Sequence, residues 1–461
     1  MSYDQSLPGQ AIAPEINIAS GLATAVIHLN WYRPTTPLEK VKRTQQAALE
    51  EAVGLAEAIQ LRVVYQQAFY LNKLSPATLI GKGNVENLQA MFQALNIKLA
   101  VVDSVLSPVQ QRNLERIWKC KVIDRTGLIL EIFGARARTA EGRLQVELAA
   151  LKHQRSRLVR SWTHLERQRG GFGFIGGPGE SQIELDRRLI DQRILKLEKD
   201  LKNIAKMRSL HRQARKRQEK PVIALVGYTN AGKSTLFNRL TQANVFAENL
   251  LFATLDPTMR RCSIPGPDNA DRLEVIFSDT VGFVSNLPTE LIAAFRATLE
   301  EVCVADLILH VRDAAHPDAS AQAQDVEAIL HDLGIVDQNP EKAPLILNVY
   351  NKIDLLTHQE NEILRNQLAR QSNAWAISAQ YGTGIEGLFA WIYHRFQAQE
   401  TSLQSLTLSC QEGTLLSWCY QKGLVVDRRD DDQGFVHLKL RLNPAQRHFL
   451  EKTRFKSSSR L

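Results

Sequence analysis

A group of glycine, lysine and serine residues near the middle of the chain has the spacing of a phosphate-binding loop. Four residues separate Gly227 from Gly232, and Lys233 and Ser234 follow directly. Glycines here let backbone N–H groups face phosphate oxygens at the start of a helix. The lysine can then reach the β- and γ-phosphates, and the serine hydroxyl can bind Mg²⁺. The expected nucleotide contacts in this segment are Gly227, Tyr228, Thr229, Asn230, Ala231, Gly232, Lys233, Ser234 and Thr235.

A second motif, Asp-Thr-Val-Gly at 279–282, begins 46 residues after Lys233. A carboxylate at a strand end can hold Mg²⁺ through water, and a glycine N–H can sense the γ-phosphate. Between the motifs, Thr254 is the expected switch threonine that completes Mg²⁺ coordination, and Thr258 is the alternative. The expected nucleotide contacts here are Phe252, Ala253, Thr254, Asp279, Thr280, Val281 and Gly282. The expected metal ligands are Ser234, Thr254 and, through water, Asp279.

The motif Asn351-Lys352-Ile353-Asp354 indicates which base is bound. The Asp354 carboxylate can accept hydrogen bonds from N1–H and the exocyclic amine of guanine. Adenine lacks N1–H and that amine, so it would leave a buried carboxylate unpaired, which is heavily penalised. A backbone N–H at Ser378-Ala379 can reach guanine O6. Motifs in this order predict GTP binding, with base contacts from Asn351, Lys352, Asp354, Ser378, Ala379 and Gln380.

The residue after Gly282 is Phe283, where Ras-type switches carry a glutamine that orients the attacking water. A phenyl ring cannot do this, so we expect a GTPase that is slow unless stimulated, with no catalytic residue assigned. Asn230 could act through K⁺, as in GTPases activated by potassium, but asparagine is equally favoured in turns. A partner that completes the site is the other route.

The elements around these motifs predict an α/β chain. Strand-like and helix-like runs alternate in the N-terminal part, which is typical of a small domain with a parallel sheet. Its strands are expected at 25–28, 62–65, 99–103 and 121–124, with helices at 38–60 and 108–118. A second set of strands is expected at 222–226, 273–278, 307–312, 345–350 and 374–378, and a half-buried strand at 435–442.

Two heptad-spaced apolar runs predict a long antiparallel helical hairpin. Between them, residues 170–179 contain six glycines and cannot continue a helix. The apolar residues are Leu144, Leu148, Leu151, Leu158, Trp162 and Leu165, then Ile183, Ile190, Ile194, Leu197, Leu201 and Ile204.

We therefore expect a P-loop GTPase domain preceded by a small α/β domain and the hairpin, with a small α+β module at the C-terminus. The expected boundaries are a flexible N-terminus at 1–24, the first domain at 25–140, the hairpin at 141–218, the GTP-binding domain at 219–398 and the last module at 399–461.

Positive charge is concentrated in the hairpin. Residues 152–220 contain 19 Lys and Arg against 8 Asp and Glu, a net of +11, whereas the whole chain is +8. Such a segment is a reasonable footprint for a phosphate backbone, although a charged hairpin can also be a solvated coiled coil.

The composition favours a cytoplasmic protein. An apolar fraction of 44% and a charged fraction of 23% exclude gross disorder and a membrane bundle. The five cysteines form no Cys-x-x-Cys pair, so they indicate neither a disulfide framework nor a zinc site. We expect no secretory signal and no membrane span, because the sequence shows no basic start before an apolar run and no apolar run of about 18 residues.

The chain resembles the HflX-type GTPases, which are related to translation factors. The resemblance covers roughly 25–395, and its motifs are 227–238, 251–258 and 279–283, together with 122–130, 145–149, 177–180 and 186–188. It implies a Mg²⁺-dependent GTPase that binds the large ribosomal subunit in the GTP state, through ribosomal RNA contacts of the basic hairpin 152–220. It further implies dissociation or recycling of stalled ribosomes, often under stress, and we expect a monomer.

Two other functions stay open. The chain could be a regulatory GTPase that acts on a protein partner, with the hairpin as a docking arm. Binding to that partner should then lose less affinity with salt than binding to RNA would. It could also be an RNA-remodelling ATPase that binds nucleotide in the N-terminal domain. That reading ranks last, because Gly81-Lys82-Gly83 lacks the P-loop pattern.

Overall fold

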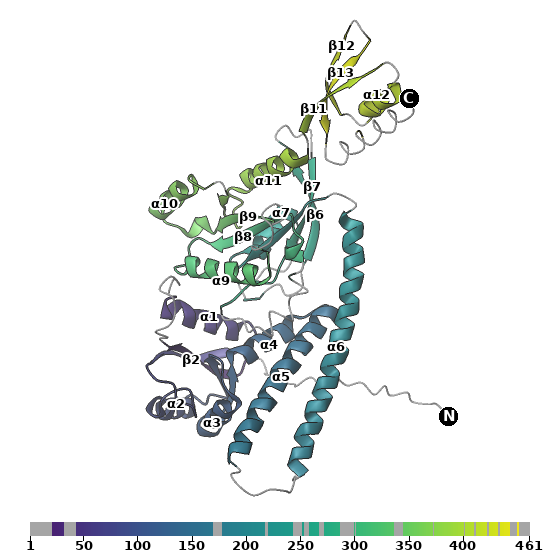
Figure 1. The fold of residues 1–461 in the computed structure, drawn as a ribbon. Coiled ribbons are helices and arrows are strands. Elements are labelled where there is room, and N and C mark those ends of the chain that lie inside the picture. The colour runs from purple at the N-terminus through teal and green to yellow at the C-terminus, as the bar shows by residue number, and fades with distance from the viewer. Residues whose placement is uncertain are drawn as a thin grey trace, which may run out of the picture. The chain divides into compact units, whose positions relative to one another are not determined.

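The computed structural model describes most of the chain (Figure 1). The described residues are 21–31, 43–168, 178–216, 220–242, 251–252, 258–266, 272–285, 299, 301–335, 344–371, 373–400, 402–409, 412–421, 424–431, 434–442 and 450. The chain divides into two compact units, 1–262 with 275–383, and 263–274 with 384–461. Within the described ranges, no helix combines the length and the apolar character needed to cross a membrane.

The first sheet of the larger unit is four-stranded and parallel, as the alternating pattern predicted. Its strands are β1 (Ala23–Trp31), β2 (Arg62–Leu71), β3 (Leu99–Asp103) and β4 (Lys121–Asp124), in the order β2-β1-β3-β4. β3 lies inside the sheet and is buried at all five residues. Parallel strands buried on both faces read as continuous apolar runs, which explains why β3 was visible in the sequence.

Helices cover both faces of this sheet. They are α1 (Gln45–Glu57), α2 (Lys82–Ala94), α3 (Pro108–Trp118) and α4 (Arg125–Arg136). α3 begins with a capping box between Ser107 and Gln110. Its C-cap residue, Lys119, has a left-handed backbone conformation that ends the helix. Phe92 and Trp118 fill the core under α2 and α3, while α1 and α4 share a second core on the opposite face with residues of the next sheet.

The helical hairpin consists of α5 (Ala140–Gln168) and α6 (Pro178–Lys216). The core between the helices contains Leu148, Leu151, Ile190, Ile194 and Leu197, with Leu144 and Leu201 partly buried beside it. α6 starts at Pro178, so the last two residues of the expected glycine loop are helical. Proline suits this position because its fixed φ matches a helix start.

Part of the predicted hairpin cannot be compared with the structure. The glycine loop from 170 to 177 and the side chains of Leu158, Trp162, Leu165 and Ile183 lie outside the described residues.

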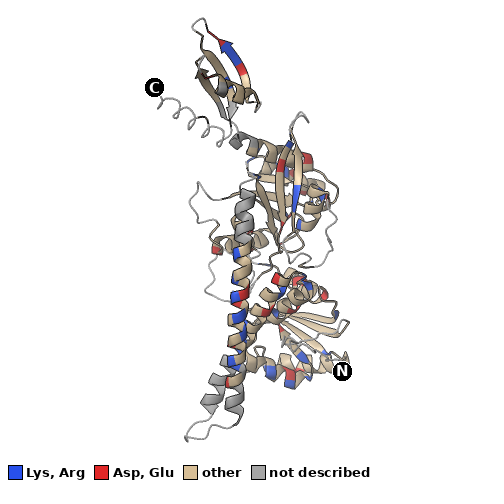
Figure 2. Ribbon diagram, turned by 90° about the vertical axis from the view of Figure 1, so that its right-hand side faces the viewer, with Lys and Arg blue, Asp and Glu red and all other residues tan. Residues whose placement is uncertain are grey.

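Ion pairs use some of the positive charge of the hairpin. Lys152 lies 2.7 Å from Glu198, Arg155 lies 3.1 Å from Asp191, and Arg193 lies 2.6 Å from Glu147. These pairs link the two helices along their length. Figure 2 marks further Lys and Arg residues on α6 in blue.

The second sheet has six strands in the order β10-β9-β8-β5-β7-β6. The strands are β5 (Val222–Gly227), β6 (Thr258–Pro265), β7 (Arg272–Asp279), β8 (Leu307–Asp313), β9 (Leu345–Asn351) and β10 (Ala374–Ala376). The main helices of this part are α7 (Lys233–Thr241), α9 (Ala319–Asp332) and α10 (His358–Leu368). β6 was not predicted, because only Ile264 of its eight residues is buried and an edge strand of this kind has little apolar pattern.

The smaller unit contains an antiparallel sheet of three strands. After α11 (Ile385–Glu400), the chain forms β11 (Ser402–Leu408), α12 (Gly413–Gln421), β12 (Val425–Asp430) and β13 (Val436–Leu442), with the sheet order β11-β13-β12. Leu408, Cys419, Leu438 and Leu440 form its core. This agrees with the α+β module expected at the C-terminus.

Replacing Leu197 by alanine should loosen the hairpin, because this side chain is only 1% exposed in the core between α5 and α6. Such a change costs about 2–5 kcal/mol. Amide hydrogen exchange along α6 should therefore accelerate by at least roughly 30-fold. Leu195→Ala is the matched control, since Leu195 is 68% exposed on the same helix. Equal acceleration in both variants would contradict the assigned core.

Candidate nucleotide-binding site

The phosphate-binding loop connects β5 to α7. β5 lies between β7 and β8, so the loop leaves the sheet at an interior position. Gly232 caps α7 with φ of +90°, and a Cβ atom there would lie 2.2 Å from the side-chain nitrogen of Asn351. Only glycine fits this conformation and this close approach. The N-terminus of α7 then supplies the partial positive charge that attracts phosphate.

Lys233 is buried at the first position of α7. Its Nζ donates a hydrogen bond of 2.8 Å to the carbonyl oxygen of Tyr228. Burial lowers the pKa of Lys233 to about 8, and the charge of Asp279 opposes this shift only in part. A bound phosphate would provide the missing negative charge and favour the ammonium form.

Ser234 and Asp279 form the expected metal-binding pair. The Ser234 hydroxyl donates to a carboxylate oxygen of Asp279 over 2.7 Å. Asp279 is fully buried at the end of β7, where it pairs in register with Leu225 of β5. The Thr280 hydroxyl bonds the Leu225 carbonyl over 2.6 Å and holds this strand end. Hydroxyl and carboxylate oxygens are the ligands that Mg²⁺ prefers.

The segment after Asp279 passes directly over the phosphate-binding loop. A Cβ atom on Gly282 would lie 2.8 Å from Cγ2 of Thr229 and 3.0 Å from Nζ of Lys233, so glycine is needed. Phe283 donates its N–H to the Gly227 carbonyl over 3.1 Å, and its carbonyl accepts from the Thr229 N–H over 2.7 Å. The Phe283 ring is 3% exposed and belongs to the apolar core.

Asn351 links the phosphate-binding loop to the expected base-binding loop. At the end of β9, its side chain donates to the Ala231 carbonyl over 2.8 Å and accepts from the Ala379 N–H over 2.9 Å. Asp354 lies exposed in a short 3-10 helix, Ile353–Leu355, and Lys352 pairs with Asp313 over 2.7 Å. An exposed carboxylate beside a fixed loop is accessible to a ligand.

The loop after β10 is held by side chains. Arg239 donates to the carbonyls of Ala379, over 3.2 Å, and Gln380. The Ser378 hydroxyl accepts from the Tyr381 N–H over 3.2 Å. Ser378 and Ala379 are buried, whereas Gln380 is exposed.

The structure thus gathers residues from four loops at one edge of the sheet, and it leaves some predicted residues aside. Asn230 is exposed with φ of +60°, a left-handed conformation that suits a turn. Phe252 is buried against Phe133 of α4 rather than open to solvent. Ala253 and Thr254 lie outside the described residues, and Thr258 begins β6.

A cavity of about 300 Å³ lies on the α1 side of the phosphate-binding loop. Its lining is rich in carboxylates, which would repel a triphosphate. We therefore expect the phosphates to lie at the backbone N–H groups and Lys233 rather than in this cavity. The acidic residues of the lining are Glu50, Glu51, Glu57, Asp313 and Asp318.

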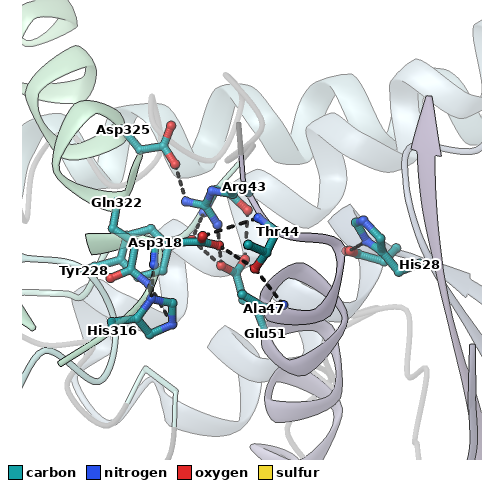
Figure 3. A network of polar contacts seen from close by, with 12 residues as sticks. His28, Arg43, Thr44, Ala47, Glu51, Tyr228, His316, Asp318, Gln322 and Asp325 are labelled. Atoms are coloured by element: carbon teal, nitrogen blue, oxygen red, sulfur yellow. Dashed lines mark hydrogen bonds and ion pairs between the residues drawn. The ribbon is translucent and has the colours of Figure 1, made fainter. Parts of the chain in front are cut away.

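Sequence reasoning missed a polar cluster that joins this site to the first sheet (Figure 3). The hydroxyl of Tyr228, in the phosphate-binding loop, bonds Glu51 of α1 and accepts from the Ser285 N–H over 2.6 Å. Arg125 donates to the carbonyl and the hydroxyl of Ser285, each over 2.9 Å. The only signal was that Arg125 falls within the family-like motif 122–130.

Comparison with protein-family models accounts for most of the chain. The model "GTP-binding GTPase N-terminal" matches residues 46–134, and "GTP-binding GTPase Middle Region" matches 136–215. The model "50S ribosome-binding GTPase" matches 222–352, and "HflX C-terminal domain" matches 363–458.

Two curated relatives match over more than four fifths of their length. The GTPase HflX of Magnetococcus marinus is 48% identical over 87% of this chain and 89% of its own. The GTPase HflX of Escherichia coli is 45% identical over 80% of this chain and 83% of its own.

Among solved structures, a GTP-binding protein from Sulfolobus solfataricus in complex with GDP is 23% identical, with a TM-score of 0.42. That match covers 81% of this chain and 98% of the other, but it is too distant to carry functional weight. The curated relatives and the family models, together with the four loops of the site, show that the chain is a GTP-binding GTPase of the HflX family.

Proposed function

We propose that the chain is a GTP-hydrolysing switch that binds the large ribosomal subunit and promotes the dissociation or recycling of stalled ribosomes. In this proposal 25–140 form an N-terminal domain, 141–218 the hairpin, 219–398 the GTP-binding domain and 399–461 a C-terminal module. The protein acts as a cytoplasmic monomer that associates with ribosomes, including under stress.

GTP is bound in this proposal by the residues that the sequence motifs nominate. Backbone N–H groups of the phosphate-binding loop and Lys233 hold the phosphates, and Asp354 selects guanine, since the Ala379 N–H already bonds the Asn351 side chain. Gly282 couples the γ-phosphate to the segment that follows it. The hydrogen bonds of Asn351 to Ala231 and Ala379 support this assignment, because they hold the phosphate and base loops at a fixed separation.

A magnesium ion would be held by Ser234 and Thr254, and through water by Asp279. The ion would neutralise charge that develops between the β- and γ-phosphates. The 2.7 Å contact between Ser234 and Asp279 supports this donor set, since both oxygens already lie side by side.

Hydrolysis is expected to be slow without stimulation, because Phe283 presents a buried ring where a water-orienting side chain would be needed. Two routes could complete the site. K⁺ bound near the exposed Asn230 is one, and a group from the ribosome is the other. In both routes, the chain's own residues bind and position GTP.

The ribosomal part of the proposal depends on one observation above all. The segment 222–352 matches a family described as a 50S ribosome-binding GTPase, and it follows a hairpin with a strong positive excess. Three exposed lysines on α6, namely Lys196, Lys199 and Lys202, can face a phosphate backbone. A protein partner that binds the hairpin would require less of this charge.

Asp354→Asn should change the base preference from guanine to xanthine. The asparagine amide would place a donor against the guanine amine, whereas xanthine has a carbonyl at that position. GTP affinity should fall by about 100-fold or more, and affinity for xanthosine triphosphate should rise. Fluorescent-nucleotide titration measures both. Asp332→Asn, an exposed carboxylate on α9, is the control. Unchanged selectivity in Asp354→Asn would refute the assignment of the base site.

Replacing Lys196, Lys199 and Lys202 together by glutamine should weaken binding to large ribosomal subunits. Each lost phosphate contact should reduce the slope of log affinity against log salt by roughly 0.7–0.9. Co-sedimentation at several KCl concentrations measures this slope. A triple lysine-to-glutamine variant at Lys73, Lys82 and Lys98, exposed residues around the first sheet, is the matched control. Retained affinity with an unchanged slope would rule out RNA contact through this face.

A further inference from the structure

Three segments in or beside the GTP site contact helices α1 and α4, which pack on the first sheet. Tyr228 of the phosphate-binding loop and Ser285, three residues after Gly282, contact Glu51 and Arg125. The third segment is apolar. The ring of Phe252 packs edge-on against Phe133 with centroids 4.7 Å apart, and Leu251 lies over Gly54, 3.2 Å from the position of a Cβ atom.

The Glu51 carboxylate is the centre of the polar contacts. One of its oxygens accepts from Arg125 and, over 2.8 Å, from the Ser285 hydroxyl. The other accepts from Tyr228 and, over 2.8 Å, from Arg43. A carboxylate has about four lone-pair sites, so the donors use all of them. We call Arg43, Glu51, Arg125, Tyr228 and Ser285 the Glu51 cluster (Figure 3 shows its Arg43, Glu51 and Tyr228).

The Glu51 cluster is held rigidly from the side of the first sheet. The Glu51 and Arg125 side chains are 8% and 6% exposed. Arg125 also donates to Asp103 of β3 over 2.5 Å, and Asp103 contacts His28 of β1 over 2.6 Å. Burial alone would raise the pKa of Glu51, but the charges of Arg125 and Arg43 outweigh it and lower that pKa. Glu51 therefore stays an acceptor at neutral pH.

We propose that Glu51 is a positioning residue for GTP hydrolysis, because it fixes the phosphate-binding loop and the segment after Gly282 in one register. Tyr228 connects Glu51 to Lys233 through its side-chain hydroxyl and its backbone carbonyl. Its hydroxyl bonds Glu51 and Ser285, while its carbonyl accepts from Nζ of Lys233. A displacement of Tyr228 would therefore move the acceptor that orients Lys233.

Ser285 carries the effect to the second segment. Its N–H, hydroxyl and carbonyl are bonded to Tyr228, Glu51 and Arg125. Two of these bonds fix the backbone just beyond Gly282, whose N–H has to meet the γ-phosphate. Since the Phe283 side chain carries no polar group, hydrolysis depends on backbone placement, and a shift of about 1 Å can cost about 100-fold in rate.

The inference rests on GTP hydrolysis and not on ribosome binding. A purely structural role for the Glu51 cluster would change stability or all ligand affinities together. A positioning role changes the rate at saturating GTP more than the affinity for GDP, because GDP does not engage the segment after Gly282.

The test compares Glu51→Gln, Ser285→Ala and the double variant in the full chain. Glutamine cannot accept from four donors, and alanine removes one hydroxyl. Each single change should slow single-turnover GTP hydrolysis at saturating GTP by roughly tenfold or more. For Ser285→Ala, which acts on the segment after Gly282, fluorescent-GDP affinity should stay within about threefold of wild type. The double variant should be about as slow as the slower single variant, because both changes break one linkage.

Tyr65→Phe is the matched control, because it also removes one hydroxyl, which bonds Gln67 on β2. Its rate should stay within about twofold of wild type. Rates within twofold in both single variants would overturn the proposal, as would multiplicative slowing in the double variant. A parallel loss of GDP affinity in Ser285→Ala would overturn it in favour of a structural role. If Glu51→Gln fails to fold, Ser285→Ala alone decides, since a normal rate there contradicts the proposal.

Discussion

The burial of Lys233 is the constraint on which the GTP site depends. An ammonium group with little access to water needs acceptors, and the protein provides the Tyr228 carbonyl and the charge of Asp279. Burial still lowers the pKa of Lys233 to about 8, and a bound phosphate would supply the remaining negative charge. Tyr228 is in turn bonded to Glu51 of α1, so the position of Lys233 is tied to a helix of the first sheet's domain.

The two sheets also share one apolar core. Phe133 and Ile129 of α4 belong to the same cluster as Tyr228, Phe252 and Phe283. The segments around Tyr228 and Phe283, which are expected to lie at the nucleotide, are therefore packed on helices outside the six-stranded sheet. If those segments move between nucleotide states, their contacts with α1 and α4 change. The bound nucleotide can in this way alter the N-terminal part of the chain.

Much of this arrangement could be predicted from sequence, because it depends on local pattern. The strands that pair in parallel in the two sheets are short apolar runs. The nucleotide motifs follow strand ends, where parallel pairing brings them together. β6 escaped prediction since its residues are mostly half-exposed. The Glu51 cluster escaped because its members, from residue 43 to residue 285, share no spacing or motif; only the fold brings them together.

The most direct test of the proposed function is co-sedimentation of the full chain with purified ribosomal subunits, comparing a non-hydrolysable GTP analogue with GDP. The proposal predicts pelleting with large subunits in the GTP-like state and much weaker pelleting with GDP or with small subunits. Equal pelleting in both nucleotide states, or none in either, would contradict a GTP-controlled ribosomal role and leave a GTPase with another partner.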